Sequence, residues 1–277
     1  MKILILGANG YVGSRIYFDI RNKYNVIGTY KSVQLHKEFI NVDITDTQQL
    51  NSVVRSIKPD IIIHTANNAS SRWCEANPDE AILLNQTSTE HVIDATQLTD
   101  AKLIYFSSFA AYEPTSIYGK TKINSEKMIQ KSIKNFVIIR PSAIFGYSPN
   151  TTNDKLFNKL LQNLNSKLPR PYDISWKFQP SYIGHLTKVI EAIIDQKITN
   201  EIIPVAVPEL STIYNTIQDI LTPFGVIVTP IDNHDTSHFS RAYPLDELQR
   251  LNLPQFTYSQ MIQSIIEEIE NKNKYIL

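Results

Sequence analysis

The chain has 277 residues, carries 27 basic and 27 acidic side chains, and contains one cysteine, Cys74. Because the net charge is zero and no charge run stands out, the composition does not favour a nucleic-acid partner or an anionic membrane. A lone cysteine excludes an internal disulfide, which fits a reducing cytoplasm, and the first apolar run is too short for a signal peptide or a membrane span. We therefore expect a cytoplasmic protein with a sizeable core.

A short apolar segment, residues 2–6, leads directly into glycines at positions 7, 10 and 13. The segment is typical of a buried parallel strand, and the residues after it are typical of a helix start. Glycines at such a turn let the backbone approach a pyrophosphate, which binds at the amino end of the helix. The spacing differs from the usual dinucleotide fingerprint, but the strand and helix context is the required one. We assign to this part of a cofactor site Gly7, Asn9, Gly10, Tyr11, Val12 and Gly13.

The second expected strand, residues 25–29, is followed by Tyr30, Lys31 and Ser32. A site specific for NAD usually has a carboxylate near this strand end, and none is present here. Lys31, helped by Arg15 or Ser32, could instead pair with a 2′-phosphate. We therefore assign Tyr30 and Lys31 to the cofactor site and favour NADP(H). The alternative is NAD(H), with Lys31 only a solvated surface residue.

Strands and helices alternate along the first half of the chain. Apolar runs predict strands at residues 61–66, 102–107 and 136–140, and helical patterns occupy residues 82–96 and 118–131. This alternation predicts an α/β fold, a Rossmann-type doubly wound parallel sheet. Ligands of such sheets bind outside the carboxyl ends of the strands, which here would bring together Gly7, Asp43, Ala66 and Ser108.

After Pro141 the pattern changes, because prolines and short irregular segments become frequent. We predict a Rossmann domain at residues 1–145, to which a helix at about 183–196 returns. Residues 146–182 and 197–277 would form a smaller, discontinuous substrate-binding lobe that ends in a helix at 258–271.

Tyr118 and Lys122 are four residues apart, so on a helix both side chains project from the same face. A free tyrosine is a poor acid-base catalyst near neutrality, but a nearby ammonium group would lower its pKa. The hydroxyl of Ser108 could then bind a substrate oxygen while Tyr118 gives or takes its proton. The plain alternative is a chance pair on an exposed helix.

Several motifs together resemble the short-chain dehydrogenase/reductase family, specifically its extended, nucleotide-sugar-modifying branch. The resemblance covers nearly the whole chain, and its carriers are residues 7–13, 42–46, 64–66, 107–108, 118–122 with Glu126, and 140–146. Within the branch the chain looks most like the dTDP-4-dehydrorhamnose reductase subfamily, judging by residues 43–46, the spacing to Asn85 and residues 179–182.

By motif position, the resemblance implies that Asp43 and Ile44 border the adenine of a dinucleotide. It also implies that Ala66 and Asn67 lie near the nicotinamide ribose, with Thr65 beside them in the cofactor site. Asp43 has a plain alternative as a strand-end turn residue, and Asn67 as a loop former.

The resemblance further implies that Ser108, Tyr118 and Lys122 form the catalytic group, and that Lys122 also holds ribose hydroxyls. Tyr118 and Lys122 are therefore assigned to the cofactor site as well. Ser108 is assigned rather than Ser107 because it stands four residues before Tyr112. Substrate contacts are assigned to Ser108, Phe109 and Arg241.

Two departures from the family pattern bear on the substrate. Only nine residues separate Ser108 from Tyr118, where the sugar-nucleotide enzymes usually carry a longer loop. That shortness suggests a more open pocket, a different substrate or a relaxed catalytic geometry. The segment around Arg241 matches the family only in part, so this arginine could bind a diphosphate or could be a surface ion-pair partner.

We expect a reductase that transfers hydride from NADPH or NADH to a ketone of a sugar nucleotide, with Tyr118 as proton donor. One alternative is an epimerase or dehydratase that retains its cofactor. Another is a catalytically silent regulatory subunit that binds NADP and a partner protein. The histidines lack ligand-like spacing, so no metal site is expected. The sequence leaves a homodimer open.

Overall fold

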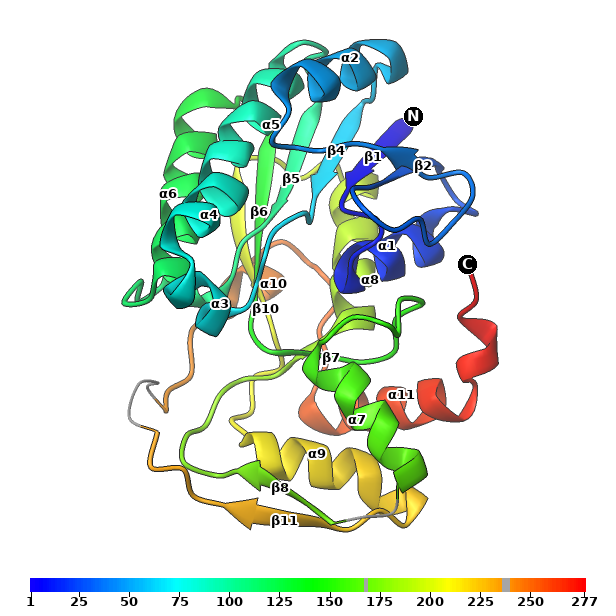
Figure 1. The fold of residues 1–277 in the computed structure, drawn as a ribbon, viewed down its shortest axis with the longest axis vertical. Coiled ribbons are helices and arrows are strands. Elements are labelled where there is room, and N and C mark those ends of the chain that lie inside the picture. Colours follow the sequence, from blue (N-terminus) through cyan, green and yellow to red (C-terminus); the bar gives the residue numbers. More distant parts are fainter. Residues whose placement is uncertain (167–168, 236–239) are drawn as a thin grey trace.

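A computed structural model of the chain describes residues 1–166, 169–235 and 240–277. Figure 1 shows a central sheet covered by helices on both faces, with a smaller lobe beside the carboxyl ends of its strands. The sheet has seven parallel strands in the order β10-β6-β5-β4-β1-β2-β3. These strands are β1 (Lys2–Leu6), β2 (Asn25–Tyr30), β3 (Ile40–Asn41), β4 (Ile61–His64), β5 (Lys102–Phe106), β6 (Phe136–Pro141) and β10 (Glu201–Val205).

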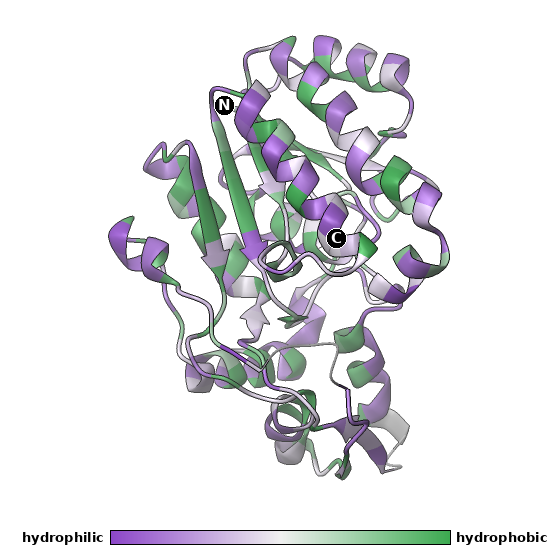
Figure 2. Cartoon of the chain, turned by 90° about the vertical axis from the view of Figure 1, so that its left-hand side faces the viewer, coloured by the Kyte–Doolittle hydropathy of each residue, from purple (hydrophilic) through white to green (hydrophobic). Residues whose placement is uncertain are grey.

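Both faces of the sheet are buried, which explains why its strands are continuous apolar runs. In β1, Ile3 and Ile5 face one core while Leu4 and Leu6 face the other. Helices α1 (Tyr11–Ile20) and α8 (Ile183–Asp195) cover the first face. The second face is covered by α2 (Thr47–Ile57), α5 (Ser88–Gln97) and α6 (Ile117–Ser132). Figure 2 shows the apolar strands enclosed by helices with hydrophilic outer sides.

The start of α6 is fixed by its cap, and this sets the position of Tyr118 and Lys122. Ser116 is extended, and its hydroxyl accepts a hydrogen bond from the backbone N–H of Gly119 at 3.0 Å. Such a cap contributes about 1 kcal/mol to helix stability. Three short elements lie between β4 and α5: α3 (Ser71–Ala76), α4 (Pro78–Ile82) and a π-helical turn at Leu83–Thr87. A single 3₁₀ turn, Phe109–Ala111, lies between β5 and α6.

The smaller lobe has its own apolar core, which includes Phe145, Phe157, Ile217 and Met261. Two parallel strand pairs, β7 with β9 and β8 with β11, lie outside the main sheet. The elements after β6, apart from α8 and β10, are β7 (Ile144–Phe145), α7 (Leu156–Ser166), β8 (Arg170–Asp173), β9 (Ser181–Tyr182), α9 (Ile213–Leu221), β11 (Val228–Ile231), α10 (Asp246–Arg250) and α11 (Tyr258–Glu270).

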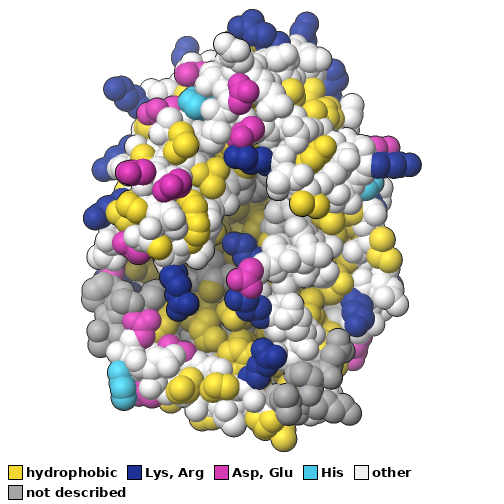
Figure 3. Space-filling model, viewed as in Figure 1, with side chains coloured by type: hydrophobic (Ala, Val, Ile, Leu, Met, Phe, Trp, Pro, Cys, Tyr) yellow, Lys and Arg dark blue, Asp and Glu magenta, His cyan; other side chains and the backbone are white. Residues whose placement is uncertain are grey.

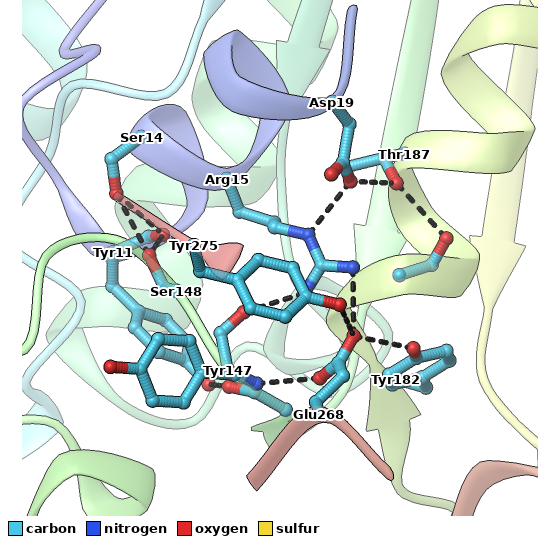
Figure 4. A network of polar contacts seen from close by, with 12 residues as sticks. Tyr11, Ser14, Arg15, Asp19, Tyr147, Ser148, Tyr182, Thr187, Glu268 and Tyr275 are labelled. Carbon is cyan, nitrogen blue, oxygen red and sulfur yellow. Dashed lines mark hydrogen bonds and ion pairs between the residues drawn. The ribbon is translucent and has the colours of Figure 1, made fainter. Parts of the chain in front are cut away.

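A buried ion pair joins α11 to α1 (Figure 4). The Arg15 guanidinium lies 2.7 Å from the Glu268 carboxylate, and it also binds Asp19 at 2.7 Å and the carbonyl of Tyr147 at 2.6 Å. Glu268 accepts further hydrogen bonds from the Tyr182 hydroxyl and the backbone N–H of Tyr147. The network therefore connects the Rossmann domain with the lobe and with the last long helix.

The predicted Rossmann-type sheet is confirmed. The structure differs from the expected domain division at residues 201–205, which were assigned to the lobe but form β10 beside β6. Pro204 favoured an irregular segment, yet β10 is the edge strand of the sheet, where a missing N–H is tolerated. Within the described ranges, no helix is both long and apolar enough to cross a membrane.

Candidate active site

The glycine turn after β1 depends on two close backbone approaches. Gly7 has φ +85°, a conformation that other residues rarely adopt, and a Cβ there would lie 2.8 Å from the backbone of Ala66. A Cβ at Gly13 would lie 2.2 Å from the carbonyl oxygen of Gly7. Gly13 therefore lets α1 pack directly on the turn, and Gly7 lets the turn form.

A cleft of about 350 Å³, which we call the glycine cleft, lies at this turn and the adjoining strand ends. It brings together most of the residues that the sequence assigned to a cofactor: Gly7, Asn9, Gly10, Tyr30, Lys31, Ile44, Thr65, Ala66 and Asn67. Six assigned residues do not line the cleft: Tyr11, Val12, Gly13, Asp43, Tyr118 and Lys122. The Tyr11 hydroxyl donates to the carbonyl of Gly146, and Val12 packs against the apolar cores. Gly13 lies behind the turn.

The loop after β7 binds the same turn from the lobe side. The Ser148 hydroxyl donates to the carbonyl of Tyr11 at 2.6 Å and lies 2.8 Å from the Ser14 hydroxyl. The Asn150 amide donates to the carbonyl of Asn9 at 2.5 Å. The glycine turn and the start of α1 are thus both bound to the lobe.

Lys31 is not isolated at the end of β2. Its Nζ lies 2.8 Å from the carboxylate of Asp43, which also accepts hydrogen bonds from Thr45. Partial burial of Asp43 opposes the effect, but these contacts lower the pKa of its carboxyl group. The prediction that no carboxylate lies at this strand end was wrong, because the fold brings Asp43 there from beyond β3.

The prediction that Arg15 could help Lys31 to bind a 2′-phosphate is also wrong. Helix α1 directs this side chain away from the glycine cleft, into the buried pair with Glu268. Ser32, the other suggested helper, does line the cleft.

Asn67 offers an unfilled binding group in the glycine cleft. Its amide donates to the carbonyl of Thr65 at 3.0 Å, while its buried Oδ1 has no hydrogen-bond partner within the described residues. Buried acceptors without partners are uncommon in native structures. A ligand hydroxyl or amide that reached this oxygen would satisfy it.

Ser108, Tyr118 and Lys122 come together where β5 ends and α6 begins. The Ser108 hydroxyl accepts from the backbone N–H of Ala110 and makes a hydrogen bond with Tyr118. The neighbouring Ser107 is engaged differently, since its hydroxyl donates to the buried Glu126, which pairs with Arg140. Ser108 is therefore the serine that faces the second cavity, which is described below.

The pKa values of this group differ from the expectation. Burial raises the pKa of Tyr118 to about 12, although the hydrogen bond with Ser108 lowers it. Burial also lowers the pKa of Lys122 to about 7, against the effect of the Glu126 carboxylate. The Nζ of Lys122 donates to the carbonyl of Phe106 at 2.8 Å and to the Tyr105 hydroxyl at 3.2 Å. The predicted lowering of the Tyr118 pKa is therefore wrong for this structure.

A second cavity, of about 520 Å³, lies between the sheet and the lobe, and we call it the interlobe cavity. Figure 3 shows this face hollowed where the two parts meet, with hydrophobic, lysine and arginine side chains around the hollow. The predicted substrate residues Ser108, Phe109 and Arg241 all line the cavity. Aromatic walls are added by Trp176, Phe178 and Tyr243.

The short segment between Ser108 and Tyr118 lines the interlobe cavity through Glu113, Thr115 and Ser116. Arg241 is ion-paired with Glu113, so it is both a cavity residue and an ion-pair partner. Within the part of the chain that the structure describes, no group of three or more His, Cys, Asp or Glu side chains could hold a metal ion.

The parallel sheet, the glycine turn and the Ser108, Tyr118 and Lys122 group define a protein of the extended short-chain dehydrogenase/reductase class. Comparison with known families agrees with the resemblance seen in the sequence. The chain belongs to the RmlD substrate binding domain family, whose model matches residues 1–244.

Curated relatives carry two kinds of name. A dTDP-4-dehydrorhamnose reductase of Salmonella typhimurium is 26% identical over 159 residues, covering 52% of each chain. A methionine adenosyltransferase 2 subunit beta of Xenopus tropicalis is 27% identical over 160 residues, covering 52% of this chain and 47% of that protein. The chain thus spans about half the length of the curated relatives it matches.

Solved structures share the fold over nearly the whole chain. The dTDP-4-dehydrorhamnose reductase of Bacillus anthracis, in complex with NADP, has a TM-score of 0.83 at 19% identity and covers 96% of this chain and 99% of its own. The UDP-glucose 4-epimerase of Thermotoga maritima has a TM-score of 0.83 at 15% identity, with coverage of 99% and 100%.

Proposed function

We propose that the protein is an NAD(P)H-dependent reductase of a keto group on a sugar nucleotide, similar to dTDP-4-dehydrorhamnose reductase. The observation that carries this proposal is the placement of Ser108 at the interlobe cavity, with Tyr118 and Lys122 buried behind it. The glycine cleft and the orphaned Oδ1 of Asn67 support a dinucleotide nearby. Both the family and the lone cysteine suit a cytoplasmic enzyme.

A nicotinamide cofactor would be held by residues of the glycine cleft such as Gly7, Gly10 and Asn67, with Lys122 toward its ribose, and would supply the hydride that reduces the carbonyl carbon. Tyr118 donates its phenolic proton to the carbonyl oxygen, so the ketone gains a hydride and a proton and becomes an alcohol. A pKa of about 12 keeps this phenol protonated at neutral pH, as a proton donor requires. The Ser108 hydroxyl donates a hydrogen bond to the same oxygen.

The lining of the interlobe cavity suits a sugar nucleotide. Trp176 and Phe178 offer flat apolar surfaces for a base or sugar ring, while Arg72, Lys177 and Arg241 offer positive charge for a diphosphate. The volume of about 520 Å³ lies within the range of small-molecule sites.

We further propose that NADP(H) is preferred, because Lys31 lines the glycine cleft. Lys31→Ala is expected to raise the Kd of NADPH about tenfold, the value of one charge-assisted hydrogen bond, and to change the Kd of NADH little. Fluorescence titration of each cofactor measures both constants. Lys37→Ala is the matched control, an exposed lysine of the same loop that does not line the cleft. Equal losses for the two cofactors would exclude a 2′-phosphate contact.

Two alternatives have their own support. The carboxylate of Asp43 beside Lys31 suits a ribose hydroxyl of NAD, as in an epimerase that retains its cofactor. The relatives named as a subunit of a methionine adenosyltransferase support a regulatory subunit.

One experiment separates the three functions. The purified protein is analysed by mass spectrometry for a retained cofactor, and then titrated with NADPH and NADH. It is finally assayed for NADPH oxidation with dTDP-4-dehydrorhamnose and other keto sugar nucleotides. We expect an initially empty site, tighter NADPH binding and substrate-dependent oxidation. Tightly retained NAD favours the epimerase, and NADPH binding without turnover of any substrate favours the regulatory subunit.

A further inference from the structure

Lys122 is held by residues of β5, the strand that ends at the candidate active site. Its side chain is fully buried, and its Nζ donates to the Phe106 carbonyl at 2.8 Å and to the Tyr105 hydroxyl at 3.2 Å. The same nitrogen lies 4.8 Å from the centre of the Tyr105 ring and 5.7 Å from that of Tyr118. Tyr105 therefore contacts Lys122 with both its hydroxyl and its aromatic face.

Tyr105 is itself fixed on every side. It is 1% exposed, and its ring lies 5.4 Å from that of His64 on the neighbouring strand β4. The hydroxyls of Ser125 on α6 and Thr89 on α5 lie near its own hydroxyl. Each of them donates to the carbonyl of Asn85, at 3.1 Å and 3.0 Å. A tyrosine locked in this way can hold a flexible lysine side chain in one place.

Among the described residues, the charged and titratable groups around Lys122 do not replace Tyr105 as a hydrogen-bond partner of its Nζ. Glu126, one turn further along α6, is occupied by Arg140 and Ser107. His64 on β4 has its pKa lowered by burial to about 3 and stays neutral, and Cys74 on α3 has its pKa raised by burial. With Tyr118 and Tyr105, these are the titratable neighbours of the lysine. The acceptors that contact its Nζ in the described residues are therefore the Tyr105 hydroxyl and the Phe106 carbonyl.

We propose that Tyr105 is a positioning residue of the active site, whose hydroxyl and ring hold the Lys122 ammonium group between β5 and the ring of Tyr118. This inference rests on the proposed function. It concerns a residue that the sequence analysis did not single out, and it assigns Tyr105 no contact with substrate or cofactor.

Tyr105→Phe tests the proposal, because it keeps the ring and removes one acceptor of the ammonium group. Without that acceptor the charged form is less favoured, so the midpoint of the Lys122 titration should fall by about one pH unit. NMR of ¹³C-lysine-labelled protein measures this midpoint without any turnover, and Lys122→Met assigns the signal. In the reductase assay, the decline of kcat/KM above neutral pH should move to lower pH by the same amount.

Tyr258→Phe is the matched control, since it removes a tyrosine hydroxyl that donates to Asp219 in the lobe at 2.7 Å. Its Lys122 titration should be that of the unaltered protein. An unshifted midpoint in Tyr105→Phe would overturn the positioning role, whether or not the protein turns over a sugar nucleotide. A shifted midpoint in a protein that reduces no tested substrate would support the role and count against the proposed function.

If Tyr105→Phe does not give a folded protein in a thermal melt, replacement of Tyr105 by 3-fluorotyrosine decides the question. The fluorine keeps the ring and the hydroxyl in place but weakens the hydroxyl oxygen as an acceptor for Lys122. The midpoint should shift in the same direction by a smaller amount, and no shift would overturn the proposal.

Discussion

Tyr118→Phe is expected to lower kcat for keto-sugar reduction by about 10²- to 10⁴-fold, the usual contribution of a positioned general acid. The change removes the phenolic proton and the hydrogen bond with Ser108, but it keeps the ring packed near Cys74 and Ala81. Folding and the Kd of NADPH should therefore change little. Steady-state kinetics with a saturating substrate, together with cofactor titration, measures these quantities.

The control for this change is Tyr214→Phe, which alters a part-buried tyrosine of α9 in the lobe and should leave kcat unchanged. Turnover by Tyr118→Phe within about threefold of the unaltered protein would show that another group supplies the proton. If the protein acts instead as a regulatory subunit, Tyr118→Phe should leave its effect on the partner intact.

Glu268→Ala is expected to lower the free energy of unfolding by about 3–5 kcal/mol, as is typical when one partner of a buried ion pair is removed. The Arg15 and Glu268 side chains are 6% and 4% exposed, so the arginine would lose a partner where water cannot replace it. The Tyr182 hydroxyl and the Tyr147 N–H would lose their acceptor as well. Urea denaturation followed by circular dichroism measures the change.

An exposed pair provides the comparison. Glu201 accepts from Arg250 at 2.6 Å, but the arginine side chain is 54% exposed. Glu201→Ala should therefore cost no more than about 1 kcal/mol. Similar losses for the two variants would mean that burial does not set the strength of the Arg15 and Glu268 contact.

Elements with a strong helical periodicity or a clear apolar run could be predicted from the sequence. The helix expected at about 183–196 is α8, Ile183–Asp195, and the strand expected at 102–107 is β5, Lys102–Phe106. Both are strongly apolar and bounded by polar or turn residues, so local pattern and tertiary packing agree. The topology of a parallel sheet predicted that Gly7, Asp43, Ala66 and Ser108 come together. Gly7 and Ala66 do line the glycine cleft, whereas Asp43 does not line it and Ser108 lines the interlobe cavity.

What could not be predicted depends on contacts between segments far apart in the sequence. Residues 201–205 read as irregular because of Pro204, and only pairing with β6 makes them a strand. The partners of Lys31 and Arg15 lie on other elements, Asp43 beyond β3 and Glu268 on α11. The orientation of Tyr105 could have been predicted from the sequence. Side chains alternate along a strand, so Tyr105 and Leu103 of β5 lie on the same face, the one covered by the helix that carries Lys122.

The contacts of the glycine turn and the start of α1 with the loop after β7 tie the two lobes together. Gly146, Ser148 and Asn150 belong to the lobe side, yet they bind the side chains or carbonyls of Tyr11, Ser14 and Asn9 on the other side. Substitutions on one side of this seam alone would leave buried donors or acceptors unmatched. The two lobes are therefore not interchangeable modules, since a change in one requires a matching change in the other.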